Sequence, residues 1–196
     1  MNRRLWLALS FAALAAGVAG CAAPPTPSGA DLTKHGRLTG VMSRRLAISE
    51  DVARVKWNTK APVEDLPREQ AVLASVRKLA VQAKLDPDRL AAFFAAQIEA
   101  SKSVQNALIA RWTGERRPPF DKVPDLGRDL RPQLDRLTFD LLAAYAVAQP
   151  ALVSANDREW FAARARHEFR GFPGEDRTAD AALVWLKQFD QERKGK

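Results

Sequence analysis

The amino-acid sequence predicts an all-α protein, a helical bundle of about six helices. From residue 32 to the C-terminus apolar residues recur at helical spacing, and no stretch alternates between apolar and polar residues for long. Asp65 and Asp86 are each followed by a proline within two residues, a pattern typical of helix starts. A chain of 196 residues, 46% of them hydrophobic, is long enough for one domain with a proper core.

The N-terminus has the features of an export signal. Arg3 and Arg4 precede the apolar run LWLALSFAALAAGVAG, which is shorter than the roughly 20 residues of a membrane-spanning helix. Cys21, the only cysteine, follows at once, and VAGC resembles the lipobox of bacterial lipoproteins. We therefore expect residues 1–21 to direct export to the periplasm, with Cys21 lipidated as a membrane anchor. The alternative is a plain cleaved signal peptide with an incidental cysteine.

The expected helices follow a spacer and are separated by breaks that contain proline. Residues 22–32 are rich in Pro and are expected to form a flexible linker. The helices are expected at residues 32–57, 65–83, 86–112, 126–149, 156–170 and 178–193. The glycine and prolines of residues 113–125 exclude a helix there, and Pro150 ends the fourth helix. We expect residues 33–149 to carry the function and residues 150–196 to form accessory helices.

Charge and composition narrow the classes of partner. Loss of Arg3 and Arg4 with the leader lowers the formal net charge of +8 by two, which still favours an acidic ligand or an anionic membrane surface. Nucleic acid is not expected as a partner, because basic residues alternate with acidic ones and the protein is expected to be exported. The sequence has no Gly-rich phosphate loop or metal-ligand cluster, and His35 and His167 are far apart, so we expect no cofactor and no metal.

Polar side chains interrupt the apolar stripes of the first and third expected helices. Arg45 and Lys56 share the inward face of the first helix. Their separation of eleven residues corresponds to three turns plus about 20°, so they line up roughly 16 Å apart. Ser101 and Gln105, four residues apart, point together from the third helix. A polar group that faces a core costs free energy unless something pairs with it, so these residues need partners.

Further charged residues lie near the starts of the second and fourth expected helices. Asp65 and Arg68 open the second helix, Glu69 shares its apolar face, and Arg131 lies near the start of the fourth. Each residue alone has an ordinary explanation, as a cap or as a partner of a neighbouring helix. Together, several inward cations with few inward carboxylates indicate a missing anion, and a guanidinium fork suits a carboxylate. We interpret these residues as a pocket for an anionic ligand between the first four helices.

The same residues carry a resemblance to a known family. Arg45 is followed by Lys56 eleven residues later, and by the segments PVEDLPRE, AAQIEASKSVQ and LRPQLD at residues 62–69, 95–105 and 130–135. In this order and spacing they resemble the AroQ-class chorismate mutases. The export signal and the additional C-terminal helices are similar to the secreted, gamma-type subgroup of that class. The resemblance covers residues 33–145 well, and the last fifty residues only in length and helical character.

The resemblance implies an enzyme that rearranges chorismate to prephenate within one molecule, without a covalent intermediate or a cofactor. Lys56 and Gln105 would donate to the ether oxygen, on which charge grows in the transition state. Arg45 and Arg131 would hold the two carboxylates of the substrate, with Arg68 nearby. The remaining candidates would hold the substrate hydroxyl and ring carboxylate or orient the cations: Asp65, Glu69 and Ser101.

Some features leave alternatives open. Some secreted members have Glu at the position of Gln105, and the match at Arg131 needs a one-residue gap, which makes Arg128 a second candidate there. Some members join their C-terminal helices by a disulfide, which this chain lacks, and the subgroup often forms homodimers.

The competing function is a non-catalytic helical lipoprotein that binds an acidic small molecule or a periplasmic partner. A third possibility is a structural envelope lipoprotein without a pocket.

Overall fold

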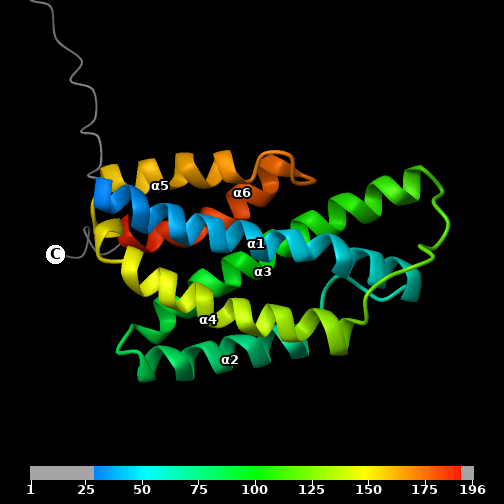
Figure 1. Cartoon of the computed structure of the whole chain (residues 1–196), viewed down its shortest axis with the longest axis horizontal. Helices are drawn as coiled ribbons and strands as arrows, with labels where there is room; N and C mark the ends of the chain where they lie inside the picture. The colour runs from blue at the N-terminus through cyan, green and yellow to red at the C-terminus, as the bar shows by residue number, and fades with distance from the viewer. Residues whose placement is uncertain (1–28, 191–196) are drawn as a thin grey trace, which may run out of the picture.

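The computed structural model describes residues 29–190, and this range contains six α-helices, three short helical turns and no strand (Figure 1). In chain order the elements are α1 (Gly29–Thr59), α2 (Leu66–Gln82), α3 (Pro87–Gly114), η1 (Leu126–Leu130), α4 (Arg131–Ala148), η2 (Ala151–Val153), α5 (Ala155–Glu168), α6 (Glu175–Leu183) and η3 (Val184–Lys187). The prediction of an all-α bundle of about six helices is confirmed. The predicted leader and Cys21 lie outside the described residues.

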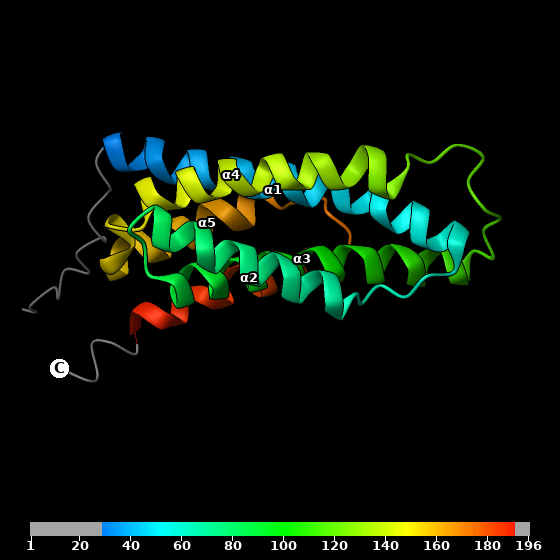
Figure 2. The ribbon, with the colours of Figure 1, turned by 90° about the horizontal axis from the view of Figure 1, so that it is seen from below.

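The two longest helices, α1 and α3, connect the two sides of the bundle. α1 packs against α3, α4 and α5, and α3 packs against α2 and α6. In Figures 1 and 2, α2 and α4 lie along one side of the α1–α3 pair, and α5 and α6 lie along the other. Residues far apart in the sequence are thereby brought together on the side where α2 and α4 meet α1 and α3.

The two predicted helix starts are formed by side-chain caps. Oδ1 of Asp65 accepts a hydrogen bond from the Arg68 amide at 3.2 Å. Oδ1 of Asp86 accepts from the amides of Asp88 and Arg89, at 2.9 and 3.1 Å. Such caps satisfy amides that have no partner in the first turn of a helix. They begin α2 and α3 within one residue of the predicted starts.

The fourth helix is divided, which corrects the expectation of one α-helix over residues 126–149. Leu126–Leu130 is a π turn, in which the Leu130 amide donates to the Asp125 carbonyl oxygen at 3.1 Å. A π turn takes up one more residue than an α turn and therefore changes the direction in which the following side chains point. Arg131 is the first residue of α4.

The last predicted helix is also divided. Gly174 has a φ of 67°, and a Cβ at this residue would lie 3.2 Å from the Ala107 side chain of α3, so glycine suits both the backbone and the close approach. α6 begins directly after it, earlier than the predicted residue 178, and passes into the 3-10 turn η3. The expectation of one α-helix over residues 178–193 is therefore wrong for its described part.

One hydrophobic core includes residues of all six helices. Trp185 of η3 contacts Phe93, Tyr145 and Phe161, with ring centroids 4.9, 5.6 and 6.0 Å apart. Inclined aromatic pairs of this kind stabilise a core beyond the burial of their area. The C-terminal elements thus support the bundle, because α5 packs on α1, α6 and η3 pack on α3, and Trp185 also reaches Tyr145 of α4.

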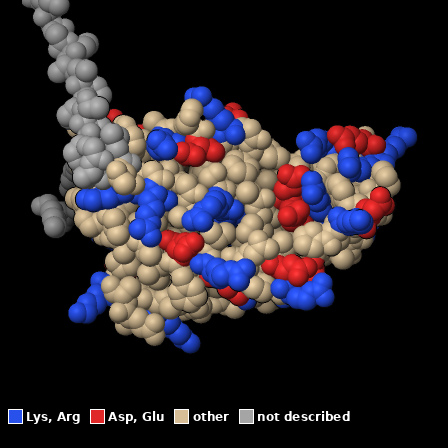
Figure 3. Space-filling view, viewed as in Figure 1, with Lys and Arg blue, Asp and Glu red and all other residues tan. Residues whose placement is uncertain are grey.

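The surface of the bundle is charged but mixed. On the face in Figure 3, Lys and Arg side chains alternate with Asp and Glu side chains, and that face has no continuous basic area. Within residues 29–190, no helix is both long enough and apolar enough to cross a membrane.

Candidate active site

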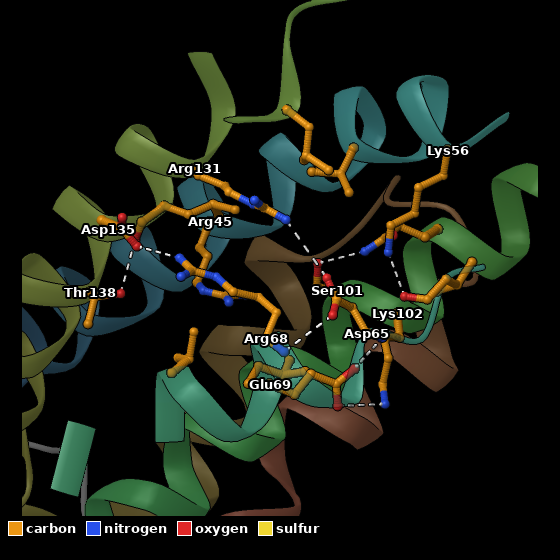
Figure 4. Close-up of a pocket in the computed structure, with 17 residues that line it drawn as sticks. Arg45, Lys56, Asp65, Arg68, Glu69, Ser101, Lys102, Arg131, Asp135 and Thr138 are labelled. Carbon is orange, nitrogen blue, oxygen red and sulfur yellow. Dashed lines mark hydrogen bonds and ion pairs between the residues drawn. The ribbon is translucent and has the colours of Figure 1, made fainter. Parts of the chain in front are cut away.

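A pocket opens between α1, α2, α3 and α4 (Figure 4). Its empty volume, including the solvent at its mouth, is about 740 Å³. All eight residues predicted to form a site line this pocket: Arg45, Lys56, Asp65, Arg68, Glu69, Ser101, Gln105 and Arg131. The predicted position of the pocket, between the first four helices, is confirmed.

Arg45 is a buried cation of the pocket, with 9% of its surface exposed. Its Nη1 donates to the Gln97 carbonyl oxygen of α3 at 3.1 Å, while its Nε has no hydrogen-bond partner among the described residues. Burial lowers the pKa of Arg45 to about 10, so the guanidinium remains charged at neutral pH. A buried charge is costly without a counter-charge, and a carboxylate in the pocket would supply one.

Lys56 is buried to the same degree and lies in the last turn of α1. Burial lowers the pKa of the Lys56 ammonium below its ordinary value, the carboxylates of Asp65 and Glu69 raise it, and two cations, Lys102 and Arg131, lower it. Burial is the largest of these effects. The pKa of Lys56 therefore depends on its burial and on the charges of its four pocket neighbours.

Gln105 and Ser101 form a hydrogen-bonded pair on α3. Nε2 of Gln105 donates to Oγ of Ser101 at 3.2 Å, and only 4% of Gln105 is exposed. Ser101 also contacts Ser49 of α1, with 2.7 Å between the two hydroxyl oxygens. The amide of Gln105 has a second N–H that is free to donate into the pocket.

Arg68 and Arg131 lie at the more exposed rim of the pocket. Nη2 of Arg68 donates to Oδ1 of Asp135 at 2.8 Å, and Nη2 of Arg131 lies 3.9 Å from Oδ2 of Asp65. These four side chains are 40–60% exposed, and ion pairs in such positions contribute little stability. A ligand carboxylate can therefore replace a protein partner at low cost. The alternative candidate Arg128 does not line the pocket, and 82% of its side chain is exposed.

Lys102 is a pocket residue that was not among the predicted ones. Its Nζ lies 2.6 Å from Oε1 of Glu99 and 3.2 Å from Oε2 of Glu69. The other carboxylate oxygen of Glu69 accepts from the Asp65 amide at 3.3 Å. Lys102 therefore ties α3 to the start of α2. It lies four residues after Ile98 and three before Gln105, so the helical period places it on the pocket face.

The charged residues of the pocket leave an excess of two positive charges. Five cations line it, Arg45, Lys56, Arg68, Lys102 and Arg131, against three carboxylates, Asp65, Glu69 and Asp135. Apolar side chains complete the walls: Val52, Val63, Val72, Ile98, Leu126 and Leu134. Among the described residues, no group of three or more His, Cys, Asp or Glu side chains is arranged to hold a metal ion. Glu99, which does not line the pocket, offsets part of this excess at Lys102, and the pocket suits a small anionic molecule.

A helical bundle with such a pocket defines a class of all-α proteins with a cation-rich small-molecule site between their helices. Residues 37–106 match the sequence model of chorismate mutase type II. The crystal structure of a chorismate mutase from Burkholderia thailandensis has the same fold, with a TM-score of 0.72 and 36% sequence identity, and the match covers 79% of this chain and 99% of that one. The chain belongs to the chorismate mutase family.

Two curated proteins are similar over part of their length. A monofunctional chorismate mutase of Enterobacter agglomerans is 35% identical over 127 residues, which are 63% of this chain and 66% of that protein. A secreted chorismate mutase of Mycolicibacterium smegmatis is 30% identical over 117 residues, which are 60% of this chain and 64% of that protein. The chain thus spans just under two thirds of the length of these relatives.

Proposed function

We propose that this protein is an exported chorismate mutase, which converts chorismate to prephenate. The rearrangement breaks the C–O bond of an ether and forms a C–C bond within the same molecule, so no atom is gained or lost. The observation that carries the proposal is that Lys56 and Gln105, both buried N–H donors, line the same pocket as three arginines. A site that only binds carboxylates does not need this additional pair.

The arginines hold the two carboxylates of the substrate. Arg45 binds one from the buried wall of the pocket, and Arg131 binds the other from the rim, with Arg68 nearby. The excess of cations over carboxylates among the residues that line the pocket supports this assignment, because chorismate carries two negative charges. Fixing both carboxylates favours the compact, chair-like shape in which the reacting carbon atoms meet.

Lys56 and Gln105 stabilise the charge that grows on the ether oxygen as the C–O bond breaks. The Lys56 ammonium has three N–H groups and the Gln105 amide has two, and each side chain uses one in a hydrogen bond with the protein. Donors held in place before the reaction interact more strongly with the transition state than with the substrate. The amide of Gln105 needs no protonation, so activity does not require acid.

Asp65, Glu69 and Ser101 complete the substrate site. We assign to them the substrate hydroxyl and ring carboxylate. Both oxygens of Glu69 already accept hydrogen bonds, from the Asp65 amide and from Lys102, which supports an additional role in orienting these neighbours. All these residues fall within residues 33–149, so we assign catalysis to this part and a supporting role to residues 150–196.

The direct test is to add chorismate to the purified protein and measure its loss together with the formation of prephenate. Catalysis predicts stoichiometric conversion, and the folded Lys56→Ala variant should be nearly inactive in the same assay. A non-catalytic binding protein would instead bind chorismate, as calorimetry would show, and leave it unchanged.

The proposal includes export to the periplasm and anchoring of the mature chain through lipidated Cys21. The leader-like residues 1–21 and the relative named as secreted support export. The lipobox-like VAGC supports the anchor. Replacing Cys21 by Ser should move the protein from the membrane fraction to the soluble periplasmic fraction with unchanged activity, and unchanged fractionation would contradict the anchor. A homodimer remains a prediction of the resemblance.

A further inference from the structure

Ser49 of α1 forms part of the hydrogen-bonded group around Gln105, although it does not line the pocket. It is 1% exposed, and its hydroxyl oxygen lies 2.7 Å from that of Ser101 on α3. The same Ser101 oxygen accepts a hydrogen bond from Nε2 of Gln105 at 3.2 Å. Ser49 is therefore two hydrogen bonds away from the amide assigned to the ether oxygen.

The single proton of the Ser101 hydroxyl decides which way the Gln105 amide can point. A serine hydroxyl has one proton and can accept two hydrogen bonds. In the Ser49–Ser101 pair either hydroxyl can donate to the other. If Ser101 donates to Ser49, the Ser101 oxygen has no proton left and can only accept from Gln105, as it does in the structure. A rotated amide would then place its own oxygen against an oxygen that cannot donate.

We infer that Ser49 is a positioning residue for the proposed rearrangement, an inference that rests on the proposed function. By accepting the proton of Ser101, Ser49 keeps the Ser101 oxygen as an acceptor for the Gln105 amide nitrogen. This arrangement holds nitrogen, not oxygen, beside Ser101. The second N–H of the Gln105 amide then remains a donor on this wall of the pocket.

Without Ser49, the opposite orientation of the amide becomes competitive. The Ser101 hydroxyl can then turn and donate to the oxygen of Gln105, once the amide has rotated by a half turn. Oε1 of Gln105 is buried and has no hydrogen-bond partner among the described residues, so the rotated amide gains a bond for this oxygen. The rotation places an acceptor where the reaction needs a donor, and an acceptor repels the growing charge on the ether oxygen.

The test compares Ser49→Ala with Ser103→Ala, a matched loss of a serine hydroxyl on α3. The Ser103 hydroxyl donates to the Glu99 carbonyl oxygen at 3.0 Å and does not line the pocket. We expect Ser49→Ala to lower kcat by about 5- to 10-fold with a smaller change in KM, as the loss of one hydrogen bond predicts, and Ser103→Ala to leave both unchanged. Ser49→Cys, with a weaker acceptor for the Ser101 proton, should lie between Ser49→Ala and the parent protein.

Kinetics in a Gln105→Ala background separate a role of Ser49 in positioning the Gln105 amide from a structural effect of Ser49→Ala. If Ser49 acts through Gln105, adding Ser49→Ala to Gln105→Ala should not lower kcat further. The inference is overturned if Ser49→Ala lowers kcat by the same factor in the parent protein and in the Gln105→Ala variant. It is also overturned if the folded Ser49→Ala and Ser49→Cys proteins keep full kcat. Either result leaves the proposed function intact. Absence of prephenate with the parent protein overturns both.

Discussion

The Lys56 ammonium donates to the Val63 carbonyl oxygen at 2.6 Å, which joins the last turn of α1 to the loop that enters α2. The Asp65 cap follows two residues later, so the position of the lysine and the start of α2 depend on each other. Two N–H groups of the ammonium remain for a ligand, because it forms no other hydrogen bond with described residues. A donor fixed in this way needs no rearrangement during the reaction.

Replacing Lys56 by Ala is expected to lower kcat by roughly 10²- to 10³-fold, the cost of losing one oxyanion donor. The effect should appear in kcat more than in KM, because the charge on the ether oxygen grows only in the transition state. Steady-state kinetics checks this, with circular dichroism as the control for folding. A folded Lys56→Ala protein that keeps full kcat would falsify the assignment.

Replacing Arg45 by Ala is expected to weaken substrate binding as well as catalysis, because a carboxylate is charged before the reaction begins. Truncation of a buried, hydrogen-bonded charge typically costs about 2 to 5 kcal/mol. We therefore expect a higher KM and a loss in kcat/KM of this size. If Arg45→Ala and Lys56→Ala raise the dissociation constant of chorismate equally and the parent protein forms no prephenate, the non-catalytic binding function is correct instead.

The residues of the pocket could be predicted from the sequence where they interrupt a regular pattern. Arg45, Lys56, Ser101 and Gln105 stand on apolar faces of long periodic helices, and the helical period alone shows this. Lys102 shares that face, but lysines are also common on solvated faces. Only the packing of α2 on α3 brings Glu69 within 3.2 Å of it.

The burial of individual side chains in the pocket and the π turn before α4 could not be predicted in the same way. Arg45 is 9% exposed, whereas the Arg131 side chain is 44% exposed, although both were expected to hold carboxylates. The difference arises from packing between helices, which a single helical pattern does not contain. The π turn before Arg131 was also missed, because Leu126 and Leu130 have the four-residue spacing of an α-helix, although Gly127 and Asp129 between them are weak helix formers.

Replacing Gln105 by Glu is expected to change a flat pH response into an acid optimum. An amide donates at any ordinary pH, whereas a carboxyl group donates only when protonated. Activity of the variant should therefore rise as the pH falls from about 8 to about 5, the range in which a Glu with a raised pKa titrates. The parent protein, measured over the same range, is the control. A flat profile for the variant would show that Gln105 is not the donor to the ether oxygen.

The pH above which activity is lost should move in opposite directions when an anion or a cation beside Lys56 is removed. Burial lowers the pKa of Lys56, the Asp65 carboxylate raises it, and the Lys102 cation lowers it. Asp65→Asn removes an anion and should lower this pKa further, so activity is lost at a lower pH than in the parent protein. Lys102→Met removes a cation and should raise it, so activity persists to a higher pH.

Both substitutions have a control in the structure. Asn keeps the ability of residue 65 to cap α2, and Glu99→Gln removes a Lys102 partner that is not among the charges acting on the pKa of Lys56. The measurement is the pH dependence of kcat/KM, which reports the ionisation of the free enzyme. Glu99→Gln should leave the alkaline limb in place. If Asp65→Asn and Lys102→Met shift the limb in the same direction, or not at all, the group that titrates there is not Lys56.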